Sequence, residues 1–307
     1  MSHLDYLNEN YPVRRKKEQK AAFRGHVVSS LEKKGVPVKI ETTKNGKNEN
    51  VVIGNPESAK LVFTAHYDTP ATSIVPNLMM PRNGVLLYIF HFLPIIAILI
   101  ASLVPALLIS TALEMEILYP IIFLVLYFGL FYLLYFTFTN KNNYNDNTSG
   151  VATLLEIIDK LPEEKLCDCA FILFDNEELG KLGSKAYFKD HKEFMRDKLV
   201  INFDCVGNGD NILFIAMKGA EQREEYKSFK ESVTGNESYS VSYYGIRGSQ
   251  GNSDHKSFPA GVCCMACSKT KNGILYTARI HTNKDTKVKN ENIDFLSDSV
   301  LSYVEKL

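Results

Sequence analysis

The chain has 307 residues, which allows one large domain or two small ones. Its 35 basic and 35 acidic side chains give a formal net charge of +0. This balance argues against binding to nucleic acid, which usually comes with an excess of basic residues, and we expect no nucleic-acid partner.

Six cysteines occur without an apolar secretory signal in the first ten residues. Two of them, Cys167 and Cys169, lie close to the start of a predicted strand, and no second Cys/His pair follows at the spacing of a zinc finger. Reduced thiols in a cytoplasmic compartment are therefore expected. The other four lie in or beside apolar runs and are predicted to be buried: Cys205, Cys263, Cys264 and Cys267.

The first predicted element is an amphipathic helix over residues 11–35, with Pro12 near its start and Gly35 near its end. It contains a basic run from Arg14 to Lys17. We interpret this run as a solvated helix face, in preference to a patch that binds a membrane surface.

Three short strands are predicted next. Residues 38–41 and 50–53 form two of them, and the Asn45-Gly46 pair between them is a strong signal for a hairpin turn. Residues 61–65 form the third strand, which ends in the polar cluster His66-Tyr67-Asp68-Thr69.

Two apolar stretches then interrupt the polar chain. Residues 84–110 and 117–138 contain no Lys, Arg, Asp or Glu, and each exceeds the roughly 20 residues that cross a bilayer core. A buried helical pair in a soluble core is the alternative, but two such runs so close together favour a transmembrane hairpin over residues 84–138.

The charges around the hairpin predict its orientation. The link between the two spans carries Glu114 and Glu116 but no Lys or Arg, whereas the outer flanks carry Arg82 and Lys141. By the positive-inside rule the link faces outward and both flanks face the cytoplasm. The chain is thus predicted to be an integral membrane protein in contact with the lipid bilayer. Residues 1–81 and 140–307 are predicted to form one discontinuous domain on the cytoplasmic side.

Strands and helices alternate after the hairpin, which predicts an α/β fold with a mixed, mainly parallel central sheet flanked by helices. The predicted strands are 171–174, 199–203, 212–216 and 262–267, and the predicted helices are 151–161, 182–189, 222–233 and 290–306.

Polar residues with metal-binding side chains follow the predicted strands. Glu177 and Glu178 directly follow one strand, and in an open α/β sheet ligands bind at that end of the strands. By themselves the two glutamates would be a solvated acidic loop near a helix N-terminus. Mixed His and carboxylate sets suit zinc or a similar divalent ion. The full set is His66, Asp68, Asp146, Glu177, Glu178, Asp204, Asp254, His255 and His281.

The order and the sequence motifs of these segments resemble those of the co-catalytic di-zinc aminopeptidase family, which also includes glutaminyl cyclase and the glutamate carboxypeptidase group. The resemblance covers most of the chain outside the hairpin and implies the fold of the zinc aminopeptidases (phosphorylase/hydrolase-like). The matching segments are Ala65-His66-Tyr67-Asp68-Thr69, Asn145-Asp146-Asn147-Thr148-Ser149-Gly150, Asp175-Asn176-Glu177-Glu178-Leu179-Gly180, Asn202-Phe203-Asp204, Ser253-Asp254-His255 and Ile280-His281-Thr282 with Asp285-Thr286.

The resemblance implies two zinc ions per chain and a role for each residue. Asp146 would bridge the two ions, with His66 and Asp204 completing one site. Glu178 and His281 would complete the other site.

Three further roles follow from the same resemblance. Glu177 would be the general base, and Asp68 would orient His66. Asp254 and His255 resemble a loop near the substrate, although a purely structural role for His255 is equally compatible with the sequence. The remaining histidines, His3, His26, His91 and His191, match no motif and are assigned no function.

The predicted function is a membrane-anchored zinc aminopeptidase, which removes N-terminal residues from peptides by metal-activated water with a glutamate general base. Three alternatives stay open: a glutaminyl-cyclase-like acyltransferase, a carboxypeptidase and a non-catalytic membrane scaffold. Cyclases of this kind use tryptophans in the site, and the chain has none. A carboxypeptidase would call for a cation such as Arg247 or Arg279 beside the substrate carboxylate.

The hairpin lies between two of the predicted ligands. Phe138 and Asp146 are so close in the chain that the metal site must lie within roughly 27 Å of the membrane edge, at about 3.4 Å per extended residue. We therefore expect membrane-proximal peptides as substrates. The sequence does not predict an oligomeric state.

Overall fold

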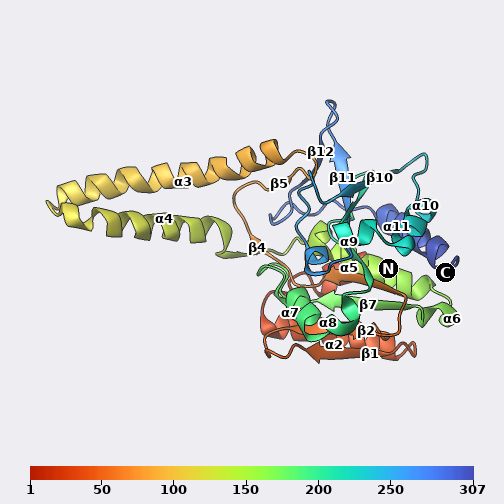
Figure 1. Cartoon of the computed structure of the whole chain (residues 1–307). Helices are drawn as coiled ribbons and strands as arrows, with labels where there is room; N and C mark the ends of the chain where they lie inside the picture. Colours follow the sequence, from red (N-terminus) through yellow and green to blue (C-terminus); the bar gives the residue numbers. More distant parts are fainter.

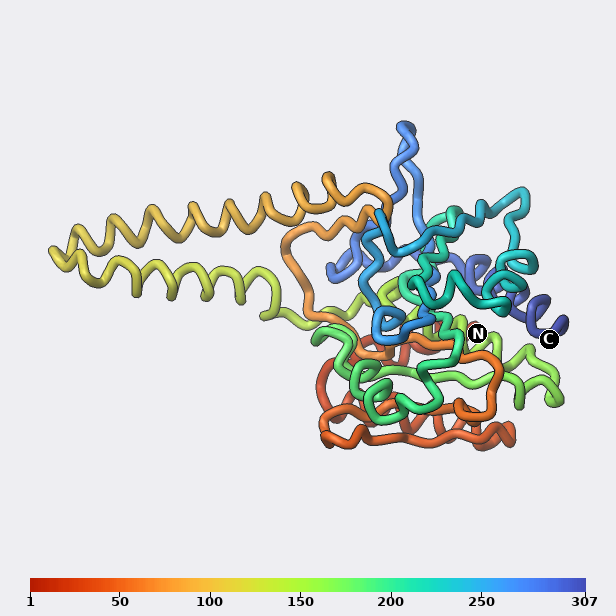
Figure 2. Tube along the Cα trace, in the orientation of Figure 1, coloured from red at the N-terminus to blue at the C-terminus, as the bar shows by residue number.

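The computed structural model describes residues 1–307 and shows a body with a long helical hairpin projecting from one end (Figure 1). We call residues 84–138 the hairpin and the rest of the chain the body. Both termini lie on the side of the body away from the hairpin (Figure 2).

The body is built on a ten-stranded mixed sheet, as predicted. Its strand order is β1-β2-β7-β3-β8-β11-β12-β5, with β9 pairing β11 and β10 pairing β9. Strands β7, β3, β8 and β11 run parallel to one another, so their carboxyl ends meet at one edge. The strands are β1 (Val38–Thr42), β2 (Glu49–Ile53), β3 (Leu61–His66), β5 (Leu78–Met79), β7 (Cys169–Phe174), β8 (Leu199–Phe203), β9 (Asn211–Ala216), β10 (Ser240–Gly245), β11 (Gly261–Lys269) and β12 (Leu275–Ala278).

Helices cover both faces of the sheet. On one face, α2, α5, α10 and α11 pack on a core that includes Phe63 and Phe171. On the other, α7 and α8 pack on Val62 and Ile172. Because these strands are buried on both faces, they read as continuous apolar runs in the sequence. The body helices are α1 (His3–Asn10), α2 (Lys17–Glu32), α5 (Ser149–Lys160), α6 (Glu163–Leu166), α7 (Leu182–Asp190), α8 (Lys192–Met195), α9 (Lys218–Glu221), α10 (Glu224–Ser232) and α11 (Asn290–Val304).

The hairpin consists of α3 (Gly84–Ala112) and α4 (Tyr119–Tyr135), which lie side by side (Figures 1 and 2). It contacts the body at its two roots, the start of α3 and the end of α4. Both helices are long and apolar enough to cross a membrane. All but five of the chain's exposed large apolar side chains lie in the hairpin. A two-stranded ribbon of β4 (Ala71–Thr72) and β6 (Phe138–Thr139) joins its base to the body.

The structure corrects the prediction for the N-terminal segment. The helix predicted over residues 11–35 is shorter in the structure, where α2 begins at Lys17 and ends at Glu32. A separate helix, α1, precedes it over His3–Asn10, and an extended segment connects the two. The basic run is not a solvated face throughout, because the side chain of Arg14 is fully buried. Lys16 and Lys17 remain exposed. The break follows from Pro12 and from Arg14, whose backbone N–H donates to Thr69 Oγ1 at 3.0 Å.

Smaller differences concern short elements. The helix predicted over residues 222–233 begins at Glu224, and five short strands were not predicted: β4, β5, β6, β10 and β12. The hairpin turn between β1 and β2 is confirmed by their antiparallel pairing. All six cysteines are free thiols, and the four predicted to be buried are buried.

Candidate metal centre

The predicted ligands converge at the carboxyl edge of the sheet. His66 is the last residue of β3, and Asp204 directly follows β8. Glu177 and Glu178 lie in the loop between β7 and α7. Since these strands are parallel neighbours, their ends bring side chains from distant parts of the sequence together.

Asp146 lies between two histidines. Its Oδ1 is 3.3 Å from His66 Nε2, and its Oδ2 is 3.0 Å from His281 Nε2. Asp204 Oδ1 lies 3.8 Å from His66 Nε2, and Glu178 Oε2 lies 3.4 Å from His281 Nε2. Two three-residue groups thus share one carboxylate: His66, Asp146 and Asp204, and Asp146, Glu178 and His281.

These groups suit zinc in both chemistry and spacing. Imidazole nitrogens and carboxylate oxygens are zinc ligands, and with bonds of about 2.0–2.2 Å the ligand atoms of one tetrahedral ion lie about 3.4 Å apart. The four separations above bracket that value. Glu178 Oε1 is buried without a hydrogen-bond partner, so the protein alone does not satisfy this carboxylate.

The charges of the cluster indicate the same requirement for a cation. Burial raises the pKa of Glu178 to about 8 and raises the pKa of Glu177 well above its usual range. Burial opposes a charged His66, but hydrogen bonds to carboxylates outweigh it and raise the pKa of His66. A divalent cation would supply the positive charge that these carboxylates otherwise take from protons.

Asp68 connects the ends of β3 and β7. Its carboxylate accepts hydrogen bonds from the backbone N–H groups of Glu177 and Glu178, at 3.0 and 3.2 Å. The nearest acceptor for His66 Nδ1 is the backbone carbonyl of Asp68 at 3.2 Å, with the carboxylate at 3.5 Å. Asp68 therefore contacts the ring it was predicted to orient, and it also holds the loop that carries both glutamates.

Two residues near Asp146 hold its backbone. Asp285 is buried, and its carboxylate accepts the N–H of Asp146 at 3.0 Å and that of Asn145 at 3.2 Å. Asn147 Nδ2 donates to the carbonyl of Phe203 at 2.9 Å, at the end of β8. Asn147 belongs to the predicted motif around Asp146. The contact between Asp285 and Asp146 could not be predicted from a local pattern, because the two residues lie far apart in the sequence.

Arg14 is a buried cation behind the site. Its guanidinium donates to the carbonyl of Tyr67 at 2.5 Å, to the carbonyl of Tyr11 at 2.7 Å and to Thr148 Oγ1 at 3.0 Å. Tyr67 lies between His66 and Asp68 in the sequence. The N-terminal segment thus fixes the loop after β3, a role that the sequence analysis did not assign.

Asp254 and His255 lie behind the site. Both side chains are fully buried, and Asp254 Oδ1 accepts a hydrogen bond from Ser184 Oγ at 2.5 Å. Neither ring nitrogen of His255 has a partner. The neighbouring Ser253 lines the cavity beside the candidate metal centre, described next, whereas Asp254 and His255 do not. Their predicted role in substrate binding stays a prediction.

A cavity of about 330 Å³ opens beside the metal ligands. Its lining includes five apolar side chains: Met79, Cys205, Cys263, Met265 and Ile280. Lys181 also lines it, and so does His91, which is carried by the hairpin helix α3. No sequence pattern predicts a role for His91, because its place on the cavity wall depends on how the start of α3 packs on the body.

A second cavity of about 420 Å³ lies on the other side of His281 and reaches Tyr135 and Phe136 at the end of α4. The remaining histidines have contacts elsewhere. His3 pairs with Asp159, His191 pairs with Glu41, and His26 stacks on two tyrosines.

The body thus combines a mixed α/β sheet with His and carboxylate side chains gathered at its carboxyl edge, an arrangement that suits a zinc-dependent hydrolase. The chain belongs to peptidase family M28, whose family model matches residues 137–303. This membership confirms the family and the enzyme class predicted from the motifs, a zinc-dependent metallo-exopeptidase.

Individual relatives agree with this assignment. The chain is 42% identical over 69 residues to the aminopeptidase YwaD of Bacillus subtilis (strain 168), a match that covers 20% of this chain and 14% of the relative.

The LapA aminopeptidase of Legionella pneumophila (TM-score 0.60, 14% identity) matches over 99% of this chain and 69% of its own. A glutaminyl cyclase of Porphyromonas gingivalis (TM-score 0.59, 16% identity) matches over 99% and 97%. A Zn-dependent exopeptidase of Parabacteroides distasonis (TM-score 0.58, 16% identity) matches over 99% and 96%. At these identities the three structures support the fold.

Proposed function

We propose that the chain is a membrane-anchored zinc aminopeptidase that binds two zinc ions. The observation that carries the proposal is the shared carboxylate of Asp146, with one oxygen facing His66 and the other facing His281. Two-metal hydrolases use such a bridging arrangement to act on one substrate bond from both sides. His66 and Asp204 would hold one ion, and Glu178 and His281 the other.

Bound zinc ions would polarise the scissile carbonyl and make water acidic enough to be deprotonated near neutral pH. Glu177 is the proposed general base: its carboxylate lines the cavity and lies in a third cluster with His66 and Glu178, outside the two groups that share Asp146. Burial raises the pKa of Glu177, so this carboxyl group can hold a proton during the reaction. It would then give the proton to the leaving amine.

The lining of the cavity favours a substrate with a free amino group. Arg247 and Arg279, the two cations considered as partners for a substrate carboxylate, do not line the catalytic cavity. Lys181 is the lysine that does, and its Nζ donates to Asn252 Oδ1 at 2.9 Å. The five apolar side chains in the lining would accept a medium-sized apolar residue such as leucine or methionine.

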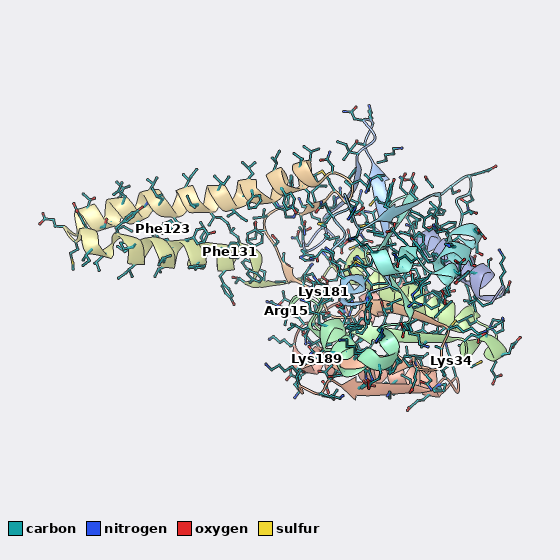
Figure 3. The ribbon with its side chains drawn as sticks, in the orientation of Figure 1. Arg15, Lys34, Phe123, Phe131, Lys181 and Lys189 are labelled. Carbon is teal, nitrogen blue, oxygen red and sulfur yellow. The ribbon has the colours of Figure 1, made fainter.

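The hairpin is the proposed membrane anchor. The 29 residues of α3 extend about 44 Å, and the 20 residues from Glu116 to Tyr135 extend about 30 Å, which matches a bilayer core of about 30 Å. Arg15 and Lys181 lie on the face of the body from which the hairpin projects (Figure 3). Cations at this boundary support a body on the cytoplasmic side. A reporter fused into residues 111–116 tests that orientation.

The site lies at the roots of the hairpin, so we propose peptides at the membrane surface as substrates. Deletion of the hairpin should lower the turnover of membrane-bound peptides more than that of soluble ones. Equal turnover by both forms in membranes would refute the substrate class without refuting the peptidase.

The decisive test is hydrolysis of aminoacyl-anilides by detergent-purified protein, with N-acetylated anilides as controls. Chelated, zinc-restored and Glu177→Gln samples are assayed in parallel. We expect cleavage that requires a free amine, zinc and Glu177. Cleavage of acetylated substrates or of C-terminal residues would replace the aminopeptidase with another exopeptidase, and cyclisation of N-terminal glutamine would indicate an acyltransferase. A protein that binds no zinc would be a scaffold.

A further inference from the structure

The root of α3 is fastened to the wall of the catalytic cavity. The backbone N–H of Gln250 donates to the carbonyl of Pro81 at 2.8 Å, and Arg82 donates to Ser249 Oγ at 2.7 Å. The guanidinium of Arg82 also lies 4.0 Å from the centre of the Tyr244 ring. The residues that follow Gln250 line the cavity, so the hairpin and this wall form one connected structure.

The root of α4 is connected to the other side of the site. The N–H of Ile74 donates to the carbonyl of Leu134 at 2.9 Å, and the N–H of Ser73 donates to the carbonyl of His281 at 2.7 Å. His281 has a backbone φ of +56°, a conformation that non-glycine residues rarely adopt. The hairpin therefore supports the site from both of its roots.

His91 lies two turns into α3 and lines the catalytic cavity. Its Nδ1 is 2.9 Å from the carbonyl of Leu87. A carbonyl only accepts, so Nδ1 carries the hydrogen, and the neutral ring is left with Nε2 as an acceptor. The side chain of His91 is exposed and Nε2 has no hydrogen-bond donor from the protein, so this nitrogen is available to a bound molecule.

The depth of His91 agrees with contact to a substrate outside the bilayer. Helix α3 is longer than a bilayer core by roughly nine residues. If the closed tip of the hairpin lies at the bilayer surface far from the body, the two turns of α3 that exceed the bilayer core, Gly84 to His91, lie on the side of the body. His91 then marks the level at which α3 enters the membrane.

We propose that His91 is a substrate-binding residue carried by the hairpin, whose Nε2 accepts a hydrogen bond from a backbone N–H of a peptide in the catalytic cavity. The inference rests on the proposed function for its substrate class. It makes the hairpin part of the recognition site for peptides that lie at the membrane surface, in addition to an anchor.

The test measures binding of a C-terminally fluorescein-labelled Leu-Gly-Gly-Gly peptide to zinc-loaded, full-length Glu177→Gln protein in nanodiscs of phosphatidylcholine and phosphatidylglycerol. Three analogues carry N-methylglycine in place of one glycine each, which removes one N–H at a time. His91→Phe keeps the ring shape without the acceptor, and His91→Gln restores an acceptor. The matched control is Phe92→Ala, an exposed neighbour that does not line the cavity.

We expect His91→Phe to weaken binding of the unmodified peptide three- to tenfold, the range of one hydrogen bond. The same change should have no effect on the one analogue that lacks the bonded N–H. His91→Gln should restore most of the affinity, and Phe92→Ala should bind like the parent.

Equal binding by His91→Phe and the parent would overturn the inference. An equal loss of affinity for all four peptides would also overturn it, because a side chain that only shapes the cavity wall would affect every peptide alike. Absence of peptide binding to every form would do the same. Hydrolysis by the wild type is measured separately, so binding without hydrolysis refutes the aminopeptidase while leaving His91 as a binding residue.

Discussion

The body and the hairpin place their apolar side chains in opposite ways. In the body a single core cluster of 39 buried residues joins helices to the sheet. In the hairpin no residue of α4 is buried, and large apolar side chains of both helices, such as Leu99 and Phe128, are exposed. Figure 3 shows side chains along the whole length of the hairpin, among them the half-buried Phe123 and Phe131. A surface of this kind is expected of a segment whose solvent is lipid.

This difference assigns separate tasks to the body and the hairpin. The body positions the candidate catalytic groups by burying strands, and the hairpin, as the proposed membrane anchor, would position the body relative to the membrane. The candidate metal centre lies where both regions meet, with His91 from α3 lining one adjoining cavity and Tyr135 from α4 lining the other. Changes in the body should therefore alter chemistry and stability, and changes in the hairpin should alter location and substrate access.

The largest expected effect is on catalysis. Glu177→Gln should lower kcat about 10²- to 10⁴-fold, because the proposed general base is lost, while bound zinc stays at the wild-type content. Glu114→Gln, the same chemical change at the tip of the hairpin, should leave kcat unchanged. Steady-state kinetics with metal analysis checks both variants. Wild-type turnover by Glu177→Gln would exclude this residue as the base.

Matched truncations test the two packing regimes directly. Phe171 is buried in the body and stacks on Phe63, whereas Phe128 on α4 is 61% exposed. Phe171→Ala should lower the free energy of unfolding by about 3–5 kcal/mol, and Phe128→Ala by less than about 0.5 kcal/mol in detergent. Denaturant unfolding followed by circular dichroism measures both. Equal losses would mean that the hairpin is a packed part of the body.

The parts that sequence reasoning predicted well are those with strong local patterns. The strand over residues 199–203 and the convergence of His66, Glu178 and Asp204 follow from apolar runs that end in polar residues, because a buried parallel strand needs that pattern. The lengths and composition of the hairpin helices follow from the absence of charge over two long runs.

The parts that were not predicted depend on contacts between distant segments. Arg14 is buried because Tyr67 and Thr148 accept its hydrogen bonds, and no pattern around residue 14 encodes those partners. His91 reaches the cavity because the root of α3 is fastened to the loop that carries Gln250. Tertiary contacts determine the positions of these side chains, and the hydrophobic periodicity of the sequence does not predict such contacts.

Identical substitutions at exposed isoleucines distinguish the two regions further. Ile100 on α3 is 56% exposed, and Ile40 on β1 is 43% exposed. Ile100→Lys should oppose membrane insertion by about 3 kcal/mol, whereas Ile40→Lys should change the stability of the body by less than about 0.5 kcal/mol. Membrane fractionation and thermal unfolding measure the two effects. Unchanged fractionation of Ile100→Lys would argue against a membrane span at α3.

The smallest expected effect separates a structural role for His255 from a catalytic one. This side chain is fully buried, and neither ring nitrogen has a partner, so Phe should fill the same space without loss. We expect His255→Phe to keep kcat/KM within about threefold of wild type at pH 8. A loss comparable with that of Glu177→Gln would show that His255 takes part in the reaction.

The pH dependence of stability provides an independent readout for the same residue. Burial lowers the pKa of His255 to about 3, against about 6.5 in the unfolded chain. Between these values the unfolded chain binds the extra proton, so the stability contributed by neutral His255 is complete above pH 6.5 and is lost as the pH falls. At pH 5 the loss should be about 2 kcal/mol.

Burial shifts the pKa of Asp254 the other way, to about 7, but this group is present in both wild type and His255→Phe. The difference between wild type and His255→Phe therefore isolates the histidine, and parallel stability curves from pH 8 to pH 5 would mean that its ring is hydrated or hydrogen-bonded in solution.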